Sequence, residues 1–345
     1  MKPVLVLGAG PAGLSAAAEL AALGAPSLLV ERESYLGGNP KRWRYAMLVP
    51  DLKPTEEVLG GLLRKVAEDP RIDKRLSTVL THAEPAAKGF RVTLRTNGSD
   101  ETRDVSAVVV ATGFEHFDSR RKFEYGYGRY PDVIDFKEFE GMITDDRIVR
   151  PSDGKAPHRI AWLLCVGSRD IQVGNTWCCR VGCSVSIKQA VEVRQRHPEI
   201  EAYVYYMDIR TYGLWEHLYW DAMQQYGVKF IRGRIGHITL AEDGVRLLAA
   251  GEDTLLNRPT EIPFDMIVLA SGMEPGAGTT EAARLFGLTV GPEGFLAPAS
   301  SDLNPIDSGV DGVFFAGAAT GPKAIVDSVT EGMGAALRAF QYARD

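Results

Sequence analysis

Cysteine is missing from most of this 345-residue chain, because residues 1–164 and 184–345 contain none. A framework of disulfide bonds spread over the fold, as in many small secreted proteins, is therefore excluded. No export signal is recognisable at the N-terminus. We therefore expect a cytoplasmic protein, in a reducing compartment where thiols serve metals or redox chemistry more often than structural disulfides.

The sequence also lacks a marked excess of charge of either sign. Its 39 Lys and Arg residues against 45 Asp and Glu residues give a net charge of −6. This balance gives no indication of a nucleic-acid partner or of an anionic membrane surface. With 45 % hydrophobic residues, the composition is that of an ordinary globular protein, and the length favours two domains.

Long uninterrupted hydrophobic runs are missing as well. Residues 4–25 form the most apolar stretch, but Gly8, Gly10 and Gly13 interrupt its first half and Glu19 lies within it. The stretch therefore predicts a buried strand and a helix of small residues, and we expect neither a membrane span nor a signal peptide.

This first stretch contains a glycine-rich turn between a strand, residues 3–7, and a helix, about residues 14–23. A second strand at residues 27–30 ends in an acidic residue. The order G-x-G-x-x-G, helix, strand, acid is typical of dinucleotide binding, with the pyrophosphate at the helix N-terminus and the acid on a ribose. The predicted site residues are Gly8, Gly10, Pro11, Ala12, Gly13 and Glu31.

A second glycine-rich turn follows the ribose acid, in the order E-R-x…G-G at residues 31–39. It resembles the FAD-binding domain of flavoproteins with two dinucleotide-binding domains. The strand that ends in Ala-Thr-Gly at residues 108–113, the late strand at 311–317 and a final helix at about 324–342 resemble that family too. The resemblance implies FAD and adds, as cofactor-binding residues, Arg32, Gly38, Asn39, Ala111, Thr112, Gly113, Gly317, Ala318, Pro322, Lys323 and Ala324. Ala318 replaces an acidic residue that is common there.

A loose internal repeat indicates how the domains are organised. Residues 89–113 and 238–272 each predict two strands, a turn and a buried strand that ends in small residues. We expect an α/β fold in which a FAD-binding Rossmann-like domain, residues 1–152 and 273–345, carries an inserted βαβ domain, residues 153–272, as in thioredoxin reductase. Such inserts bind NAD(P)H, but here the turn after strand 159–164 keeps only Gly167 of the phosphate-binding glycines.

All four cysteines lie at and after that turn, as Cys165, Cys178, Cys179 and Cys183. Residues 180–194 have helical composition, which would place Cys179 and Cys183 one turn apart on one face. Four thiolates suit a single [4Fe–4S] cluster, whereas zinc sites usually have paired C-x2-4-C ligands. We therefore predict all four as cluster ligands, with free or redox-active thiols as the alternative.

An NAD(P)H-dependent disulfide reductase is the alternative function, because flavoproteins of that kind share this architecture. They use C-x-x-C in the insert or C-x4-C near the first helix, and the sequence has neither arrangement in those places. Cys178 and Cys179 could form only a strained vicinal disulfide. These observations disfavour the alternative.

The cysteine segment, CVGSRD…WCCRVGC…IKQA, and the segments that begin at Tyr125 and Thr320 are similar to the A subunit of the heterodisulfide reductases. The similarity is strongest to the short Hdr-like A subunit of bacterial sulfur oxidisers. One cysteine is displaced, because Cys179 stands at a serine position of the family and Gly182 at a cysteine position.

The resemblance implies a FAD and [4Fe–4S] electron-transfer subunit that stores flavin electrons and relays them singly to partner subunits in cytoplasmic sulfur oxidation. It also implies a homodimer that works with heterodisulfide-reductase-like B and C subunits. Lys188 matches a family lysine beside the flavin N5, and we predict it as the catalytic residue.

Overall fold

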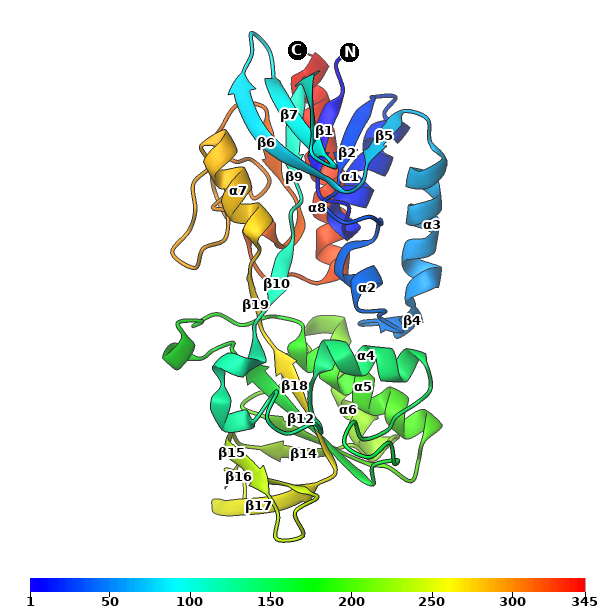
Figure 1. Ribbon diagram of the computed structural model, residues 1–345, viewed down its shortest axis with the longest axis vertical. Helices are drawn as coiled ribbons and strands as arrows, with labels where there is room; N and C mark the ends of the chain where they lie inside the picture. Colours follow the sequence, from blue (N-terminus) through cyan, green and yellow to red (C-terminus); the bar gives the residue numbers. More distant parts are fainter. Residues whose placement is uncertain (345) are drawn as a thin grey trace. The chain divides into compact units, whose positions relative to one another are not determined.

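Two parallel sheets of five strands each form the centres of an α/β fold (Figure 1). The computed structural model describes residues 1–344. The chain divides into unit 1, which comprises residues 1–42, 55–115 and 274 to the C-terminus, and unit 2, which comprises residues 43–54 and 116–273. Short apolar strands such as Val-Leu-Val-Leu are buried on both faces, as expected for parallel sheets that are covered on both sides.

The sheet of unit 1 has the strand order β20-β9-β1-β2-β5, and all its neighbours are parallel. Its strands are β1 (Val4–Leu7), β2 (Ser27–Val30), β5 (Ile72–Arg75), β9 (Ala107–Val110) and β20 (Val313–Phe315). One face packs against helices α1 (Pro11–Ala22), α3 (Thr55–Glu68) and α8 (Ile325–Arg344). The other face packs against α7 (Ala277–Phe286) and an antiparallel sheet of β6 (Thr78–Pro85), β7 (Phe90–Thr96) and β8 (Ser99–Val105).

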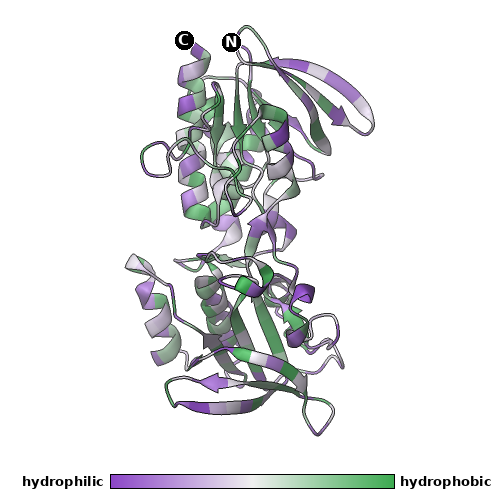
Figure 2. Cartoon of the chain, turned by 90° about the vertical axis from the view of Figure 1, so that its left-hand side faces the viewer, coloured by the Kyte–Doolittle hydropathy of each residue, from purple (hydrophilic) through white to green (hydrophobic). Residues whose placement is uncertain are grey.

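Unit 2 repeats this plan, with the strand order β11-β18-β12-β13-β14. Its strands are β11 (Val133–Asp135), β12 (Arg159–Val166), β13 (Glu201–Tyr206), β14 (Lys229–Arg232) and β18 (Met266–Ser271). Helices α4 (Phe136–Thr144), α5 (Gly182–Arg196) and α6 (Glu216–Gln224) cover one face. The other face carries an antiparallel sheet of β15 (Ile235–Leu240), β16 (Leu247–Asp253) and β17 (Arg258–Phe264). The strands at the centre of each unit are hydrophobic (Figure 2).

Smaller elements complete the described chain. They are the strands β3 (Met47–Leu48), β4 (Lys53–Pro54), β10 (Phe114–His116) and β19 (Met273–Pro275), the short helix α2 (Gly38–Arg42), and the 3-10 turns η1 (Ser119–Arg121), η2 (Phe123–Tyr125), η3 (Ile171–Val173), η4 (Gly213–Trp215) and η5 (Gly317–Thr320). Among residues 1–344, no helix combines the length and the apolar character that crossing a membrane requires.

Unit 2 begins earlier in the chain than the expected insert at residue 153. The reason is pairing and packing, since β11 pairs with β18 and α4 packs into the same core as α5. Residues 43–54 also belong to unit 2, where Ala46 and Leu52 pack against that core. The division into a FAD-binding domain and an inserted cluster domain at residues 153–272 stays a prediction.

The internal repeat has one more strand in each unit than the sequence pattern indicated. β6 and β17 are outer strands of the antiparallel sheets, and both carry many half-exposed and exposed residues. Their apolar alternation is weak because the sequences TVLTHAEP and RPTEIPF contain few apolar residues. The hydrophobic pattern therefore did not detect these two strands.

Glycines in two helices of unit 1 give a stability prediction. A Cβ on Gly13 in α1 would lie 1.8 Å from the Gly8 carbonyl oxygen, whereas a Cβ on Gly61 in α3 would meet no atom within 4 Å. Gly13→Ala should therefore lower the free energy of unfolding by roughly 1–3 kcal/mol or more. Gly61→Ala, the control, should raise it by up to about 1 kcal/mol, because alanine favours a helix. Urea denaturation measures both, and equal effects would contradict the packing described.

Candidate functional site

The carboxyl ends of β1, β9 and β20 lie at one edge of the unit 1 sheet, because these strands are neighbours and parallel. The turn after β1 approaches the turn after β9 closely. Gly8 has a φ of +100°, and a Cβ there would lie 2.4 Å from the Ala111 carbonyl oxygen. In open parallel sheets, ligands bind at this edge of the sheet.

Two further segments reach the glycine-rich turn of β1. A Cβ on Gly38 would lie 2.8 Å from the Gly10 Cα, and one on Gly317 would lie 2.7 Å from the Ala12 Cβ. Segments near residues 10, 38, 111 and 317 therefore meet at one place although they are far apart in the sequence. They carry most of the predicted cofactor residues, namely Gly8, Gly10, Pro11, Ala12, Gly13, Gly38, Ala111, Thr112, Gly113, Gly317 and Ala318.

The N-terminus of α1 has the features of an anion-binding site. Its N-cap, Gly10, offers no side-chain cap, and its first turn contains no acidic residue. The first N–H groups of the helix therefore remain available to a phosphate. Glu31 is buried after β2, where its carboxylate accepts hydrogen bonds from the Ala9 N–H at 2.7 Å and the Glu33 N–H at 2.9 Å. An ionised carboxylate has further acceptor sites for ribose hydroxyls.

Several predicted cofactor residues are held by protein partners. Arg32 pairs with Glu115 at 2.6 Å, the Asn39 amide donates to the Phe114 carbonyl at 3.4 Å, and the Thr112 and Thr279 hydroxyls lie 2.9 Å apart. These contacts hold the side chains of Arg32, Asn39 and Thr112 in place near the glycine-rich turn after β1.

Glu331 is a residue of this site that the sequence did not indicate. Its carboxylate accepts from the Gly317 N–H and from the Lys323 ammonium, both at 2.9 Å. Pro322, Lys323 and Ala324 lead from η5 into α8, so Glu331 ties this connection to the helix. In the sequence, a glutamate in an amphipathic helix is indistinguishable from one on a solvated face.

The connection after β12 in unit 2 differs from a nucleotide-binding turn. β12 ends at Val166 and α5 begins only at Gly182, whereas such a turn leads directly into its helix. Gly167 faces protein, because a Cβ there would lie 2.1 Å from the ring of Phe117, which is fully buried. The one glycine that remains in this turn therefore serves packing.

The cysteines lie along this connection and at its ends. Cys165 stands next to an irregularity in β12 and has a φ of +62°. Cys178 is half-buried and Cys179 buried in the loop, and Cys183 is buried in the first turn of α5. The expectation that Cys179 shares a helix face with Cys183 was wrong, because the helix starts later. Arg180, with a φ of +63°, separates the adjacent cysteine pair from α5.

The four thiols nevertheless influence one another. The pKa of Cys178 is lowered to about 5, chiefly because the Cys179 thiol donates a hydrogen bond to it. The same hydrogen bond is the largest cause that raises the pKa of Cys179. Burial and the charges of the other three thiols raise it further. Burial raises the pKa of Cys183 to about 12, with further contributions from Cys165 and Cys178. The structure therefore gathers the four thiols in one neighbourhood.

The proximity of the four thiols does not by itself make a metal-binding site. Among residues 1–344, no group of three or more His, Cys, Asp or Glu side chains is arranged so that it could hold a metal ion. The predicted [4Fe–4S] ligand set is therefore not confirmed. All four cysteines are free thiols, so the donor atoms that such a cluster needs are present.

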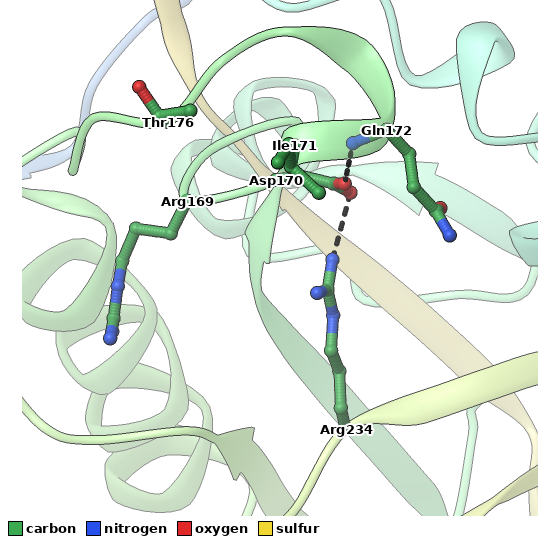
Figure 3. A pocket seen from close by; sticks show the side chains of 6 residues that line it. All are labelled: Arg169, Asp170, Ile171, Gln172, Thr176 and Arg234. Carbon is green, nitrogen blue, oxygen red and sulfur yellow. Dashed lines mark hydrogen bonds and ion pairs between the residues drawn. The ribbon is translucent and has the colours of Figure 1, made fainter.

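A pocket of about 270 Å³ lies beside the cysteine segment and is lined by Arg169, Asp170, Ile171, Gln172, Thr176 and Arg234 (Figure 3). Within it, Asp170 accepts from Arg234 at 2.8 Å and from the buried Lys122 at 2.9 Å. Arg169 extends away from the Asp170–Arg234 pair (Figure 3). Asp170 thus pairs with two positive charges, and Glu124 also pairs with Lys122 at 2.6 Å.

Lys188 is only 2 % exposed, so it is buried within unit 2 and does not lie on a solvated helix face. Its ammonium lies 2.5 Å from Glu140 and 3.2 Å from the Met47 carbonyl oxygen. Glu140 also accepts from the Gln189 amide at 2.8 Å. Lys188 is therefore one member of a buried polar network of unit 2, and Glu140 is a partner that the sequence did not reveal.

Glu192 lies one helical turn after Lys188 and is buried as well. Neither of its carboxylate oxygens has a hydrogen-bond partner among residues 1–344. Burial raises its pKa to about 7, against the opposing effect of Lys188. A carboxyl group is thus kept largely protonated in the interior of unit 2 below neutral pH.

Comparisons with known proteins agree with this architecture. The family described as pyridine nucleotide-disulphide oxidoreductase matches residues 2–147. Thioredoxin reductases of Lactococcus lactis and T. acidophilum, at 16 % and 15 % identity, superpose with a TM-score of 0.66 each and cover 100 % of this chain and 99 % of theirs. The chain therefore has a thioredoxin-reductase-like α/β fold, and the expected fold is confirmed.

Nearer relatives define the family more closely. The A subunit of H(2):CoB-CoM heterodisulfide,ferredoxin reductase from Methanothermobacter thermautotrophicus is 43 % identical over 242 residues, which are 68 % of this chain and 37 % of that protein. The iron-sulfur A subunit of CoB--CoM heterodisulfide reductase from Methanocaldococcus jannaschii is 42 % identical over 238 residues, 67 % of this chain and 36 % of that protein. The chain belongs to the family of heterodisulfide reductase A subunits, an oxidoreductase family. It spans little more than a third of these relatives' length.

The buried lysine gives a prediction about stability. Lys188→Met leaves Glu140 buried without its ion-pair partner and should lower the free energy of unfolding by about 3–5 kcal/mol. Adding Glu140→Gln should recover much of this loss, because the unpaired charge disappears. Lys229→Met, the control, breaks the exposed pair with Glu201 and should cost about 1 kcal/mol or less. Urea unfolding of the four proteins measures these values, and equal losses for the two lysines would contradict the burial of Lys188.

Glu192 gives a prediction about pH. Its pKa is higher in the folded protein, about 7, than in the unfolded chain, so the folded state binds the extra proton between about pH 4.5 and 7. The wild type should therefore lose up to about 3 kcal/mol of stability as the pH rises through this window. Glu192→Gln should be the more stable protein at pH 8, with little difference at pH 4.5. Denaturation curves across this range that stay parallel for the two proteins would refute the assignment.

Proposed function

We propose that the chain is a FAD and [4Fe–4S] electron-transfer subunit of a heterodisulfide-reductase-like complex. It would store flavin electrons and relay them singly to partner subunits, in cytoplasmic sulfur oxidation. The observation that carries the proposal is the gathering of four free thiols in a connection where the fold class commonly binds a nicotinamide nucleotide.

The chain's own residues suit this role. In unit 1, the uncapped N-terminus of α1 would bind the FAD pyrophosphate and Glu31 the ribose. In unit 2, Cys165, Cys178, Cys179 and Cys183 would ligate the cluster, which supplies a one-electron centre when it is bound. The relative from Methanocaldococcus jannaschii carries the words iron-sulfur subunit in its name, which supports a cluster in this family.

Lys188 is proposed as the catalytic residue. An ammonium group beside the flavin would stabilise the negative charge that reduction places on the isoalloxazine ring. Glu140 balances this charge within unit 2 and holds Lys188 in one position. Removal of the ammonium should therefore make the flavin harder to reduce.

The relatives support membership of a larger assembly, since their names describe A subunits of heterodisulfide reductases. We propose a homodimer that exchanges electrons with B and C subunits, where the chemistry on sulfur compounds would take place. The place of this assembly in sulfur oxidation rests on the resemblance of the cysteine segment to the Hdr-like A subunit of sulfur oxidisers.

An NAD(P)H-dependent disulfide reductase remains the second candidate, because the family that matches residues 2–147 is named for pyridine nucleotides and disulfides. The long β12–α5 connection and the packing of Gly167 against Phe117 disfavour it. Rapid bleaching of the flavin by NADPH would favour this second candidate over our proposal.

Purification of the full chain without oxygen tests the proposal. We expect about one FAD and about four irons per chain, because a [4Fe–4S] cluster takes four thiolates. Cys165→Ser should reduce the iron content to less than half while the FAD remains, since that residue lies in unit 2. Thr176→Ala, a substitution of an exposed residue in the same connection, should keep both cofactors. A wild-type protein that binds FAD but no iron would overturn the proposal.

A further inference from the structure

Residues 43–54 form a strap, which leaves unit 1 after α2, joins unit 2 and returns to unit 1 at α3. Its strands, β3 and β4, have two residues each and pair with each other. So short a hairpin does not hold itself in place. Contacts with α4 and α5 must therefore keep the strap on unit 2.

One attachment of the strap lies at the end of α4. The Arg44 guanidinium donates to the two Asp145 carboxylate oxygens at 2.9 and 2.5 Å, and the Thr144 hydroxyl donates to the Arg44 carbonyl oxygen at 2.7 Å. Arg44 lowers the pKa of Asp145 below its ordinary value, and burial raises the pKa of the strap's own Tyr45. This attachment therefore keeps its charges near neutral pH.

The second attachment is the buried ion pair between α4 and α5. Glu140 accepts a hydrogen bond from the Ala46 N–H at 3.2 Å, and the Lys188 ammonium donates to the Met47 carbonyl oxygen at 3.2 Å. The two side chains lie 2.5 Å apart and are 1 % and 2 % exposed. Each member of the pair thus holds one backbone group of the strap.

Glu192 is a second buried carboxyl group beside Lys188. It follows Lys188 by four residues on α5, a spacing at which the side chains of a helix are neighbours. Neither of its oxygens has a hydrogen-bond partner among residues 1–344, and the charged groups that act on it there are Lys188, Arg196 and Glu140. Helix α6 and the strands that share this core with α5 add none within the same range.

Two buried carboxyl groups therefore compete for one ammonium group. While Glu192 is protonated, Lys188 is held by Glu140 and by the Met47 carbonyl oxygen. An ionised carboxylate without a partner is costly in the interior, so ionisation of Glu192 favours an ammonium that turns toward it. That movement gives up the contact with Met47. Ionisation of Glu192 and release of the strap therefore favour each other.

We propose that the strap is proton-sensitive: it is docked on α4 and α5 while Glu192 is protonated, and its hold on α5 is released when Glu192 ionises. Burial, which raises the pKa of Glu192 to about 7, places this change near neutral pH. The strap follows α2 directly, and α2 begins at Gly38, which packs against Gly10 of the predicted cofactor turn. The inference does not depend on the proposed function, because no step of it involves a cofactor.

Hydrogen exchange in the full-length protein tests the proposal, with the Ala46 amide as the probe. Its protection factor, which is corrected for the intrinsic exchange rate, reports opening of the strap. Between pH 6 and pH 8 we expect it to fall at least about fivefold in the wild type, if the pKa of Glu192 is one unit lower when the strap is released. Glu192→Gln and Glu192→Met, which lack the ionisable group, should show the same protection factor at both pH values.

Two further variants serve as controls. Asp145→Asn weakens the attachment at the end of α4, so it should lower the protection of the Ala46 amide at both pH values and keep the fall between them. Glu261→Gln replaces an exposed glutamate on β17 and should behave as the wild type.

Two results would overturn the inference. One is a wild-type protection factor that is equal at pH 6 and pH 8. The other is a fall that persists in both Glu192 variants, because it would assign the pH dependence to another group, such as His116, whose ring nitrogen lies 3.4 Å from the Tyr45 hydroxyl. The proposed function would stand in either case, since the FAD and iron contents test it separately.

Discussion

The repulsion among four neighbouring cysteine thiolates is the electrostatic constraint on which unit 2 depends. Each deprotonated cysteine makes the next one harder to deprotonate, and this mutual effect joins Cys165, Cys178, Cys179 and Cys183. The Arg169 and Arg210 guanidinium groups oppose this effect, because they act to lower the pKa of Cys165 and of Cys178 respectively. A cationic metal centre would relieve the same repulsion more completely.

The long β12–α5 connection provides room for this group of thiols. In a nucleotide-binding unit, the strand would turn directly into a helix whose N-terminus binds phosphate. Here the chain instead makes a loop from residue 167 to 181, and the remaining glycine packs against Phe117. Unit 1 keeps the usual arrangement, with glycine backbones in close approach at the edge of the sheet. The two units therefore share a fold but differ in the chemistry for which their βα turns are suited.

Much of this could be predicted from the sequence, because local patterns determine it. The glycine spacing and the buried strand before it placed the turn at Gly8–Gly13 and Glu31 correctly relative to α1 and β2. The start of α5 was misplaced, because composition does not reveal that Arg180 adopts a left-handed φ. The partner Glu140 was missed because it lies 48 residues from Lys188 in the sequence. Glu331 was missed because a glutamate in an amphipathic helix resembles one on a solvated face. Such pairs depend on tertiary packing.

Stepwise reduction of the anaerobic protein, with the electrons counted, tests most directly whether flavin and cluster act together in this chain. Photoreduction followed by absorbance and EPR should consume about three electrons per chain, two for the FAD and one for the cluster. The EPR signal of a reduced [4Fe–4S] cluster should develop as the flavin absorbance falls. Uptake of only two electrons, with complete flavin bleaching and no cluster signal, would contradict the account.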